Sequence, residues 1–369
     1  RLLRKESDEM MKSNLIKILI FFLVSLPLVG CQLGQKPATD KEKNYQLAIF
    51  DVNKILTFEE NNGRLKQLET IARNKELSYW KEGFVAADGD SFFAKTKEDS
   101  QYRSYVATID GKTLKERFVP TKGHTIYTSA TDGTYYYATA VFMDRIEFYK
   151  YDLTLNVVHS KSIKNAETIN ASNQFVVIGD DLYLLVSQVV GATGVEQTEL
   201  WRMDKEFTIQ EKIKLEEANP YLRMVNIGEK LYLTEAFNGK SAEGYIGGRQ
   251  ILVYDLANHS KEYIQLSTSY PLDIYHDPVH NNLLIAHEPS HLSGIYWTLY
   301  HLDSGKETVL TFPEIQQEDS RSSFFTMKNG RYYFLFANNL IEVDEHGQKV
   351  ANHDLTPYQL KSPHALMIE

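Results

Sequence analysis

Residues 179–204 read GDDLYLLVSQVVGATGVEQTELWRMD, and this stretch contains the unit on which the fold depends. A Gly turn is followed by an apolar strand, a variable connection, and a second strand that ends in a hydrophobic residue and Asp. Residues 182–186 are apolar at every position, whereas a strand with one face in water alternates apolar and polar residues. Both faces of this strand are therefore expected to be covered.

The same unit recurs along the chain from Tyr45 onward. Its turn-and-strand step appears six times, at Asp88-Gly89, Asp132-Gly133, Gly179, Gly228, Asn281-Asn282 and Asn329-Gly330. Its hydrophobic-Asp step follows each time, at Ile109-Asp110, Tyr151-Asp152, Met203-Asp204, Tyr254-Asp255, Leu302-Asp303 and Val343-Asp344. The aspartates are 42, 52, 51, 48 and 41 residues apart, a period typical of four-stranded propeller blades. We expect each carboxylate to cap backbone N–H groups of the turn after it, which is a structural role.

The two ends of the repeating region are complementary. Residues 45–72 contain three expected strands but lack the first strand of a unit, and residues 364–369 resemble a first strand with nothing after it. If the last strand joins the first blade, the ring closes without exposed sheet edges. We therefore predict an all-β, seven-bladed β-propeller over residues 45–369, with six or eight blades as the alternatives.

A short apolar segment precedes this region and is typical of a signal peptide. Residues 18–28 (ILIFFLVSLPL) follow Lys12 and Lys17, and a helix of this length rises about 16 Å, roughly half of a bilayer core. The segment suits a signal peptide better than a stable membrane span. We predict that residues 1–30 are the signal peptide and that residues 1–9, before any methionine, are an over-extended gene start.

Leu28-Val29-Gly30-Cys31 follows directly and resembles the bacterial lipobox, in which the cysteine is acylated and becomes the mature N-terminus. The resemblance implies at least two acyl chains on Cys31, enough for stable membrane anchoring outside the cytoplasm. An ordinary secretory signal with a chance cysteine is the alternative. Residues 31–44 are predicted to carry the lipid and form a flexible polar tether. The pattern does not distinguish a Gram-positive from a Gram-negative envelope.

The charge and cysteine content restrict the partners. The chain carries a net charge of −9, and the part from Cys31 onward has 35 basic and 46 acidic residues, a net charge of −11. An acidic protein of this kind is not expected to bind nucleic acid. Cys31 is the only cysteine, so no intramolecular disulfide forms. We expect a monomer that meets the membrane through its lipid.

Motifs with catalytic or metal-binding chemistry are not found in the sequence. His276 and His280, like His287 and His291, are four residues apart, but proline and strand context exclude the helix that such a zinc site needs. The innermost strands, such as residues 127–130 (YTSA), show no recurring carboxylate. No metal, cofactor or catalytic residue is therefore predicted.

Three long connections between second and third strands stand out, at residues 188–199, 237–250 and 287–295. In a propeller these connections share one face, and insertions commonly gather on the face that binds. We predict a raised rim that presents seven ligand-binding candidates: Tyr245, Arg249, His287, Glu288, His291, Tyr296 and Trp297. Variable loops without a ligand are the alternative.

These features favour a non-catalytic binding or scaffold module that engages a protein, peptide or glycan. An enzyme similar to propeller lactonases, glycosidases or quinoproteins is the alternative, and it requires ionisable groups that converge at the tunnel. The architecture is also similar to that of the outer-membrane assembly lipoprotein, but the repeat signature of that family is absent. A shared fold is weak support for a shared function.

Overall fold

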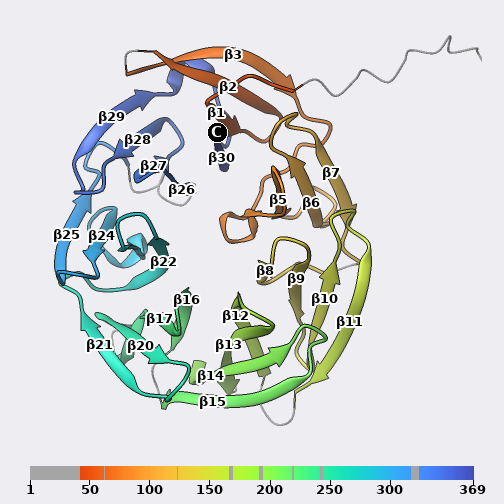
Figure 1. Ribbon diagram of the computed structural model, residues 1–369, viewed down its shortest axis with the longest axis vertical. Coiled ribbons are helices and arrows are strands. Elements are labelled where there is room, and N and C mark those ends of the chain that lie inside the picture. The colour runs from red at the N-terminus through yellow and green to blue at the C-terminus, as the bar shows by residue number, and fades with distance from the viewer. Residues whose placement is uncertain are drawn as a thin grey trace, which may run out of the picture. The chain divides into compact units, whose positions relative to one another are not determined.

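The computed structural model describes residues 42–369, with gaps at residues 62, 123, 166–168, 191–193, 218–219, 242–243 and 317–323. Cys31 and the predicted signal peptide lie outside the described residues. Within the compact unit Lys43–Glu369, seven four-stranded antiparallel sheets stand around a central axis (Figure 1). This arrangement confirms the predicted all-β, seven-bladed propeller.

Each blade runs from an innermost to an outermost strand (Figure 1). In that order, the strands are β30 (Ala365–Ile368), β1 (Leu47–Phe50), β2 (Lys54–Asn61) and β3 (Arg64–Ala72); β4 (Val85–Ala86), β5 (Ser91–Lys95), β6 (Tyr105–Asp110) and β7 (Glu116–Pro120); β8 (Ser129–Thr131), β9 (Tyr136–Val141), β10 (Arg145–Tyr151) and β11 (Val157–Lys164); β12 (Ile169–Ile178), β13 (Asp181–Val190), β14 (Gly194–Asp204) and β15 (Ile209–Glu217); β16 (Tyr221–Ile227), β17 (Lys230–Glu235), β20 (Gln250–Asp255) and β21 (Lys261–Gln265); β22 (Pro271–Asp277), β23 (Asn282–His287), β24 (Tyr296–His301) and β25 (Lys306–Thr311); and β26 (Phe324–Lys328), β27 (Arg331–Leu335), β28 (Asn339–Val343) and β29 (Lys349–Asp354).

A two-stranded ribbon and three 3₁₀ helices complete the described elements: β18 (Phe237–Ser241) with β19 (Gly244–Gly247), η1 (Lys81–Gly83), η2 (Pro289–His291) and η4 (Thr356–Tyr358). In the part of the chain that the structure describes, no helix has the length and apolar character of a membrane span.

The C-terminal strand closes the ring. β30 pairs antiparallel with β1, so that Ala365 lies opposite Phe50 and Ile368 lies opposite Leu47. The three N-terminal strands and β30 together make one complete blade, as predicted from the two incomplete ends. Because this pairing covers the edge of β1 that would otherwise remain unpaired, the first blade has four strands like the others.

The hydrophobic core consists of clusters between neighbouring blades. All six residues of β23 are buried, as are residues 182–186 of β13, which confirms that both faces of the second strands are covered. One cluster joins Phe148 of β10 to Trp201 of β14, and another joins Leu284 of β23 to Phe334 of β27. Such apolar burial is the main stabilising contribution to the ring.

The repeated aspartates mostly have the predicted capping role. The carboxylate of Asp204, for example, accepts hydrogen bonds from the backbone N–H groups of Glu206 and Thr208. Equivalent bonds to the turn that follows are made by Asp110, Asp152, Asp255 and Asp344. Asp303 differs, because its carboxylate accepts a hydrogen bond from the side-chain amide of Asn281.

A polar network lies beneath the closing strand. The buried guanidinium of Arg73 donates to the carboxylate of Glu116, with an Nη2–Oε1 distance of 2.7 Å. It also donates to the backbone oxygens of Asp51 at 2.8 Å and Leu77 at 2.5 Å. The ring of His364, just before β30, lies 3.3 Å from Arg73 Nη1. Burial, reinforced by the Arg73 charge, lowers the pKa of His364 to about 3, so this histidine is neutral.

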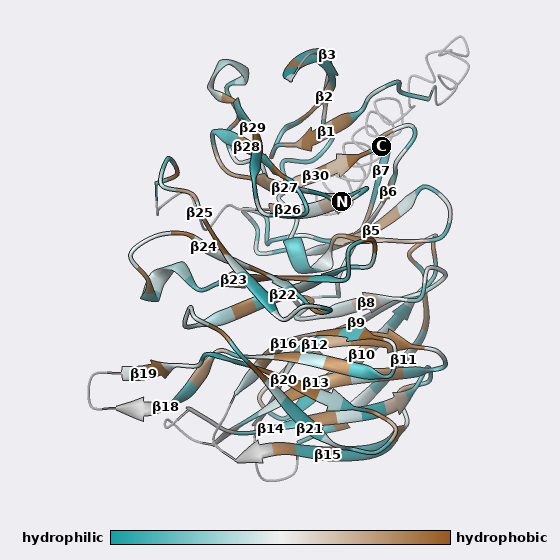
Figure 2. Cartoon of the chain, turned by 60° about the vertical axis from the view of Figure 1, so that its left-hand side comes forward, coloured by the Kyte–Doolittle hydropathy of each residue, from teal (hydrophilic) through white to brown (hydrophobic). Residues whose placement is uncertain are grey.

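Two kinds of connection share one face of the disc. Because consecutive strands are antiparallel, the connection from a second to a third strand lies on the same face as the connection from an outermost strand to the next blade. The β18–β19 ribbon and η2 belong to the first kind and η1 to the second, so all three are on this face. Figure 2 shows β18 and β19 standing away from the body of their blade. The first long connection is partly strand, because β13 and β14 extend into it.

Candidate functional site

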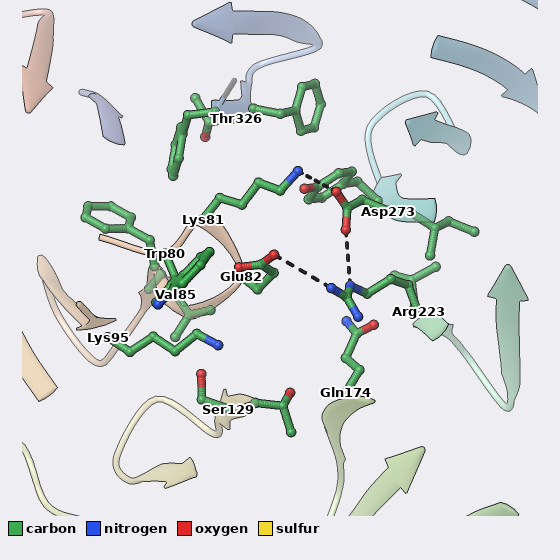
Figure 3. Close-up of a pocket in the computed structure, with 18 of the residues that line it drawn as sticks. Trp80, Lys81, Glu82, Val85, Lys95, Ser129, Gln174, Arg223, Asp273 and Thr326 are labelled. Carbon is green, nitrogen blue, oxygen red and sulfur yellow. Dashed lines mark hydrogen bonds and ion pairs between the residues drawn. The ribbon is translucent and has the colours of Figure 1, made fainter. Parts of the chain in front are cut away.

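A cavity of about 960 Å³ occupies the central tunnel. All seven innermost strands contribute residues to its lining, together with η1 and the residues beside it. The apolar part of the wall includes Trp80, Phe84, Phe92, Met224, Phe324 and Phe325. Among the ionisable residues of the lining, five are referred to below as the charged cluster: Lys81, Glu82, Lys95, Arg223 and Asp273 (Figure 3).

Asp273 is the centre of the charged cluster. Its Oδ2 accepts a hydrogen bond from Lys81 Nζ at 2.6 Å, and its Oδ1 accepts one from Arg223 Nε at 3.1 Å. The guanidinium of Arg223 also lies 3.7 Å from Glu82 Oε1 (Figure 3). Only 4% of Asp273 is exposed, so a buried carboxylate is held between two cations.

The charges in the cluster stabilise one another against burial. Burial opposes ionisation of Asp273, but attraction to Lys81 and Arg223 outweighs it and keeps the pKa of Asp273 below its ordinary value. Burial also opposes the charge on Lys81, yet Asp273 raises the pKa of that lysine above its ordinary value. With three basic and two acidic side chains, the charged cluster has a formal net charge of one positive unit.

Irregularities at equivalent points of three innermost strands aim polar residues into the cavity. The register between first and second strands shifts between Ser172 and Gln174 in β12, between Tyr221 and Met224 in β16, and between Pro271 and Ile274 in β22. The residues left out of the ladder directly before pairing resumes are Asn173, Arg223 and Asp273. A β-bulge re-aims side chains and is frequent next to functional sites.

Lys95 reaches the cavity from the second strand of its blade. It is the last residue of β5, and its Nζ donates to the backbone oxygen of Tyr127 at 2.7 Å. Burial, aided by the charge of Arg223 and opposed by Glu82, lowers the pKa of Lys95 to about 8. This lysine is therefore the most readily deprotonated cation of the charged cluster.

The predicted rim residues are distributed between surface and interior. Arg249 is exposed, and its Nε donates to Ser269 Oγ at 2.9 Å. His287 is buried, with Nδ1 2.8 Å from the backbone oxygen of Ser269 and Nε2 2.9 Å from Thr298 Oγ1. Burial lowers the pKa of His287 to about 4, so this neutral ring supports the blade from within. Its side chain is not on the rim surface, contrary to the prediction.

Glu288 and His291 do lie on the rim, at the two ends of η2. Glu288 caps this helix through a bond from the Ser290 N–H to its carboxylate, and its own N–H donates to the backbone oxygen of Tyr270. The exposed ring of His291 stacks on Tyr270, with ring centroids 4.7 Å apart. Arg249 and His287 contact Ser269, and Glu288 and His291 contact Tyr270. The four candidates therefore lie close together around residues 269–270.

Tyr296 and Trp297 contact other residues. Tyr296 is half-buried, and its hydroxyl lies 3.2 Å from Ser293 Oγ. Trp297 is 4% exposed and packs on Phe325, with ring centroids 4.9 Å apart, so it supports the tunnel wall from behind. The backbone of Tyr245 pairs with Lys240 in the β18–β19 ribbon, and the side chain of Tyr245 lies outside the described part.

Sequence reasoning missed the charged cluster, although one signal for it exists. Asn173, Arg223 and Asp273 stand at equal intervals of 50 residues, the blade period in this part of the chain. Their identities differ, so they do not form a recurring carboxylate in the sequence. No group of three or more His, Cys, Asp or Glu residues suited to a metal ion occurs among the described residues.

Comparisons with known proteins show the fold. The structure is similar to a "putative 6-phosphogluconolactonase" from Bacteroides uniformis (TM-score 0.56, 13% identity, covering 88% of this chain and 100% of the other). It is also similar to a second protein so described from Bacteroides fragilis (0.60, 12%, 88% and 97%) and to the Pan2 WD40 domain of Neurospora crassa (0.51, 11%, 80% and 83%). No family model and no curated sequence matches the chain. At these identities the similarity establishes a propeller and leaves the activity open.

Proposed function

We propose that this chain is an exported lipoprotein, anchored to a membrane by lipid on Cys31, whose propeller binds a small polar organic molecule in the central tunnel without transforming it. The observation that carries the binding proposal is the convergence of the charged cluster in one cavity with apolar walls. The lipobox resemblance of residues 28–31 supports the anchor.

A small molecule suits this site better than a macromolecule on the rim. Pockets for small ligands are concave, about 300–1,000 Å³ in volume and largely apolar, with a few polar groups that fix orientation. The tunnel cavity, at about 960 Å³, has these properties. The rim offers fewer accessible side chains to a partner than predicted, because those of His287 and Trp297 are buried inside their blade.

The environment of Asp273 favours binding over acid–base chemistry at this carboxylate. A general acid or base works best with a pKa near the operating pH. The pKa of Asp273 is instead lowered, because the two cations that hold its oxygens outweigh the effect of burial. The ionised form of Asp273 is thereby favoured, and it holds Lys81 and Arg223 in place.

The binding proposal is tested with the full chain in detergent, by thermal shift against a panel of small polar metabolites and by native mass spectrometry of co-purified molecules. The double variant Lys81→Met/Asp273→Leu removes one ion pair without changing the net charge of the cluster and leaves Arg223 beside Glu82. We expect it to lose ligand binding. Arg249→Ala on the rim is the control and should bind as the unmodified chain does. Loss of binding only in the rim variant would overturn the proposal.

Membrane anchoring has its own test. Cys31→Ser should move the protein from the membrane fraction to the soluble fraction and abolish incorporation of labelled palmitate, because no other cysteine is present. Unchanged fractionation of Cys31→Ser would show that the lipobox interpretation is wrong.

Lactone hydrolysis is the second candidate. Glu82 supports it, because its carboxylate lies in the same cavity as the Lys95 amine and faces Arg223 at 3.7 Å rather than at hydrogen-bonding distance. The two similar structures described as putative 6-phosphogluconolactonases suggest the substrate to assay first. Hydrolysis of 6-phosphogluconolactone above the spontaneous rate, lost in Glu82→Gln, would replace the binding proposal with an enzyme.

A further inference from the structure

Lys95 owes its place in the cavity to a glycine. A Cβ atom on Gly83, the last residue of η1, would lie 2.2 Å from Lys95 Cγ and 2.9 Å from Lys95 Cδ. The alkyl stem of Lys95 therefore runs directly beneath the backbone of η1, and only glycine leaves room for it. This packing holds the stem in one path and delivers the amine to the tunnel (Figure 3).

The Lys95 ammonium is buried without a protein counter-charge in contact. Only 4% of the residue is exposed, and within the described residues its one hydrogen-bond acceptor is the neutral backbone oxygen of Tyr127. Lys81 and Arg223, by contrast, both bind Asp273. Buried charges in proteins are ordinarily paired, because removing an ion from water is costly. A cation that faces a cavity without such a partner is complementary to an anion supplied from outside.

The polar groups near Lys95 have hydrogens left to donate. Ser129 Oγ accepts from the Tyr136 hydroxyl at 2.7 Å, so the hydrogen of Ser129 is available. Thr128 Oγ1 accepts a hydrogen bond from the Phe175 N–H at 3.3 Å, so the hydroxyl hydrogen of Thr128 is also available to donate. Both residues line the cavity next to Tyr127, the residue that Lys95 contacts.

Gln174 adds a further donor from the next innermost strand. Its Oε1 accepts from the Met224 N–H at 2.7 Å, which fixes the orientation of the amide and directs the NH₂ group away from that bond. Gln174 lines the cavity, and its neighbour Phe175 is the residue that contacts Thr128. Within the described residues, this wall therefore offers one ammonium, two hydroxyls and one amide as donors.

We propose that Lys95, Thr128, Ser129 and Gln174 form an oxyanion subsite, and that the tunnel ligand carries a carboxylate or a phosphate that binds there. The inference rests on the proposed binding function and adds the chemical class of the ligand. Lys95 supplies the opposite charge, and the three neutral donors direct hydrogen bonds to the anionic oxygens. The carboxylate of Glu82 faces Arg223, and Asp273 binds Lys81 and Arg223, so both carboxylates are engaged with the other cations of the charged cluster (Figure 3).

The test compares matched probes by isothermal titration calorimetry of the full chain in detergent. The pairs are gluconate with glucitol and glucose 6-phosphate with glucose, and inorganic phosphate is titrated alone. Each anion should bind at least tenfold more tightly than its uncharged counterpart. Preference for gluconate would identify a carboxylate subsite, and preference for glucose 6-phosphate and inorganic phosphate would identify a phosphate subsite.

Lys95→Met keeps the length of the stem beneath Gly83 and removes the charge. We expect it to weaken anion binding at least tenfold and to leave the binding of uncharged probes unchanged. Lys164→Met, which removes a lysine from the outermost strand β11, is the control for net charge and should bind anions normally.

The outcomes separate this inference from the proposed function. If glucitol and glucose bind as tightly as their anionic counterparts and Lys81→Met/Asp273→Leu abolishes both, the tunnel binds a ligand but the oxyanion subsite is refuted. If none of the three anions binds the unmodified chain, the inference is likewise overturned, and a co-purified uncharged ligand would leave the proposed function standing.

The stability of Lys95→Met gives a second, independent readout. Without ligand, replacing an unpaired buried charge by an apolar side chain should leave the unfolding midpoint equal or raise it. A clearly lower midpoint, with anion binding unchanged, would assign Lys95 a purely structural role through its bond to Tyr127 and contradict the proposal.

Discussion

Glu116→Gln tests how strongly the polar network beneath the closing strand holds the ring together. In the structure, Glu116 receives two charge-assisted contacts from Arg73, with Nη2–Oε1 at 2.7 Å and Nε–Oε2 at 3.0 Å. The hydroxyl of Tyr79 donates to the same carboxylate. Glutamine keeps the size of the side chain but removes its charge and replaces one acceptor by a donor. The guanidinium of Arg73 would then remain buried and charged without its counter-ion.

The expected loss follows from the burial of the pair. The side chain of Arg73 is 0% exposed and that of Glu116 is 7% exposed. Arginine does not deprotonate in proteins, so the cost cannot be avoided by a shift in protonation. Removing one partner of a buried ion pair destabilises a protein by about 3–5 kcal/mol. Because whole proteins are stable by about 5–15 kcal/mol, this single change should remove a large share of the total.

The structure offers a matched control with the same contact distance. Lys66 and Glu59 also lie 2.7 Å apart, but their side chains are 66% and 38% exposed. Exposed pairs of this kind contribute about 0–1 kcal/mol, because water and salt screen them. Glu59→Gln should therefore leave the urea midpoint almost unchanged, whereas Glu116→Gln should lower it strongly.

Urea unfolding followed by circular dichroism measures both variants, together with the double variant Arg73→Met/Glu116→Leu. We expect the double variant to lose less stability than Glu116→Gln, because it removes both charges instead of leaving one unpaired. If Glu116→Gln proved no more destabilising than Glu59→Gln, the buried pair would not stabilise the closure and the reasoning would fail.

Three further predictions concern single side chains. His287 is neutral in the folded state with a pKa of about 4, so the unfolded state takes up its proton first as the pH falls below about 6.5. The contribution of His287 to the free energy of unfolding should therefore fall by about 2 kcal/mol between pH 7 and 5, and the unmodified chain should lose about that much more stability than His287→Asn over this range. Asp204→Ala removes two turn-capping hydrogen bonds and should cost about 1–2 kcal/mol in urea unfolding, whereas an unchanged midpoint would exclude the capping role. Burial and the charge of Arg223, opposed by Glu82, lower the pKa of Lys95 to about 8. Anion affinity, measured by calorimetry, should therefore fall about tenfold from pH 7 to 9 as Lys95 loses its proton. An affinity that does not change with pH would count against binding through the ammonium.

The fold could be predicted because its determinants are local and repeated. The Gly turns before the second strands take a left-handed backbone, as at Gly179 and Gly228, both with φ of +59°, and such turns are visible in sequence. The missing first strand at one end and the surplus strand at the other defined the closure, because residues 365–368 could pair only where a strand was lacking. Repetition thus supplied long-range information that a single unit does not contain.

The site could not be predicted in the same way, because exposure within a propeller depends on packing between blades. His287 and Trp297 are polar or amphipathic residues beside a long connection, which favoured a place on the rim. In the structure the ring of His287 finds two hydrogen-bond partners inside its blade, and Trp297 packs on aromatic residues of the tunnel wall. Lys95 differs from expectation in another way. A lysine at the end of a strand normally faces water, but the side chain of Lys95 passes beneath the backbone of Gly83 and is buried.

The location of the charged cluster also has a geometric reason. Regular positions of an innermost strand alternate toward the two neighbouring blades, where apolar packing decides the residue. A side chain can leave this alternation where the ladder is interrupted, and the bulges that release Asn173, Arg223 and Asp273 are such places. Since these bulges lie toward the starts of their strands, they share a face with η1, which contributes Lys81 and Glu82. The charged cluster thus lies toward the mouth on the same face as the β18–β19 ribbon and η2.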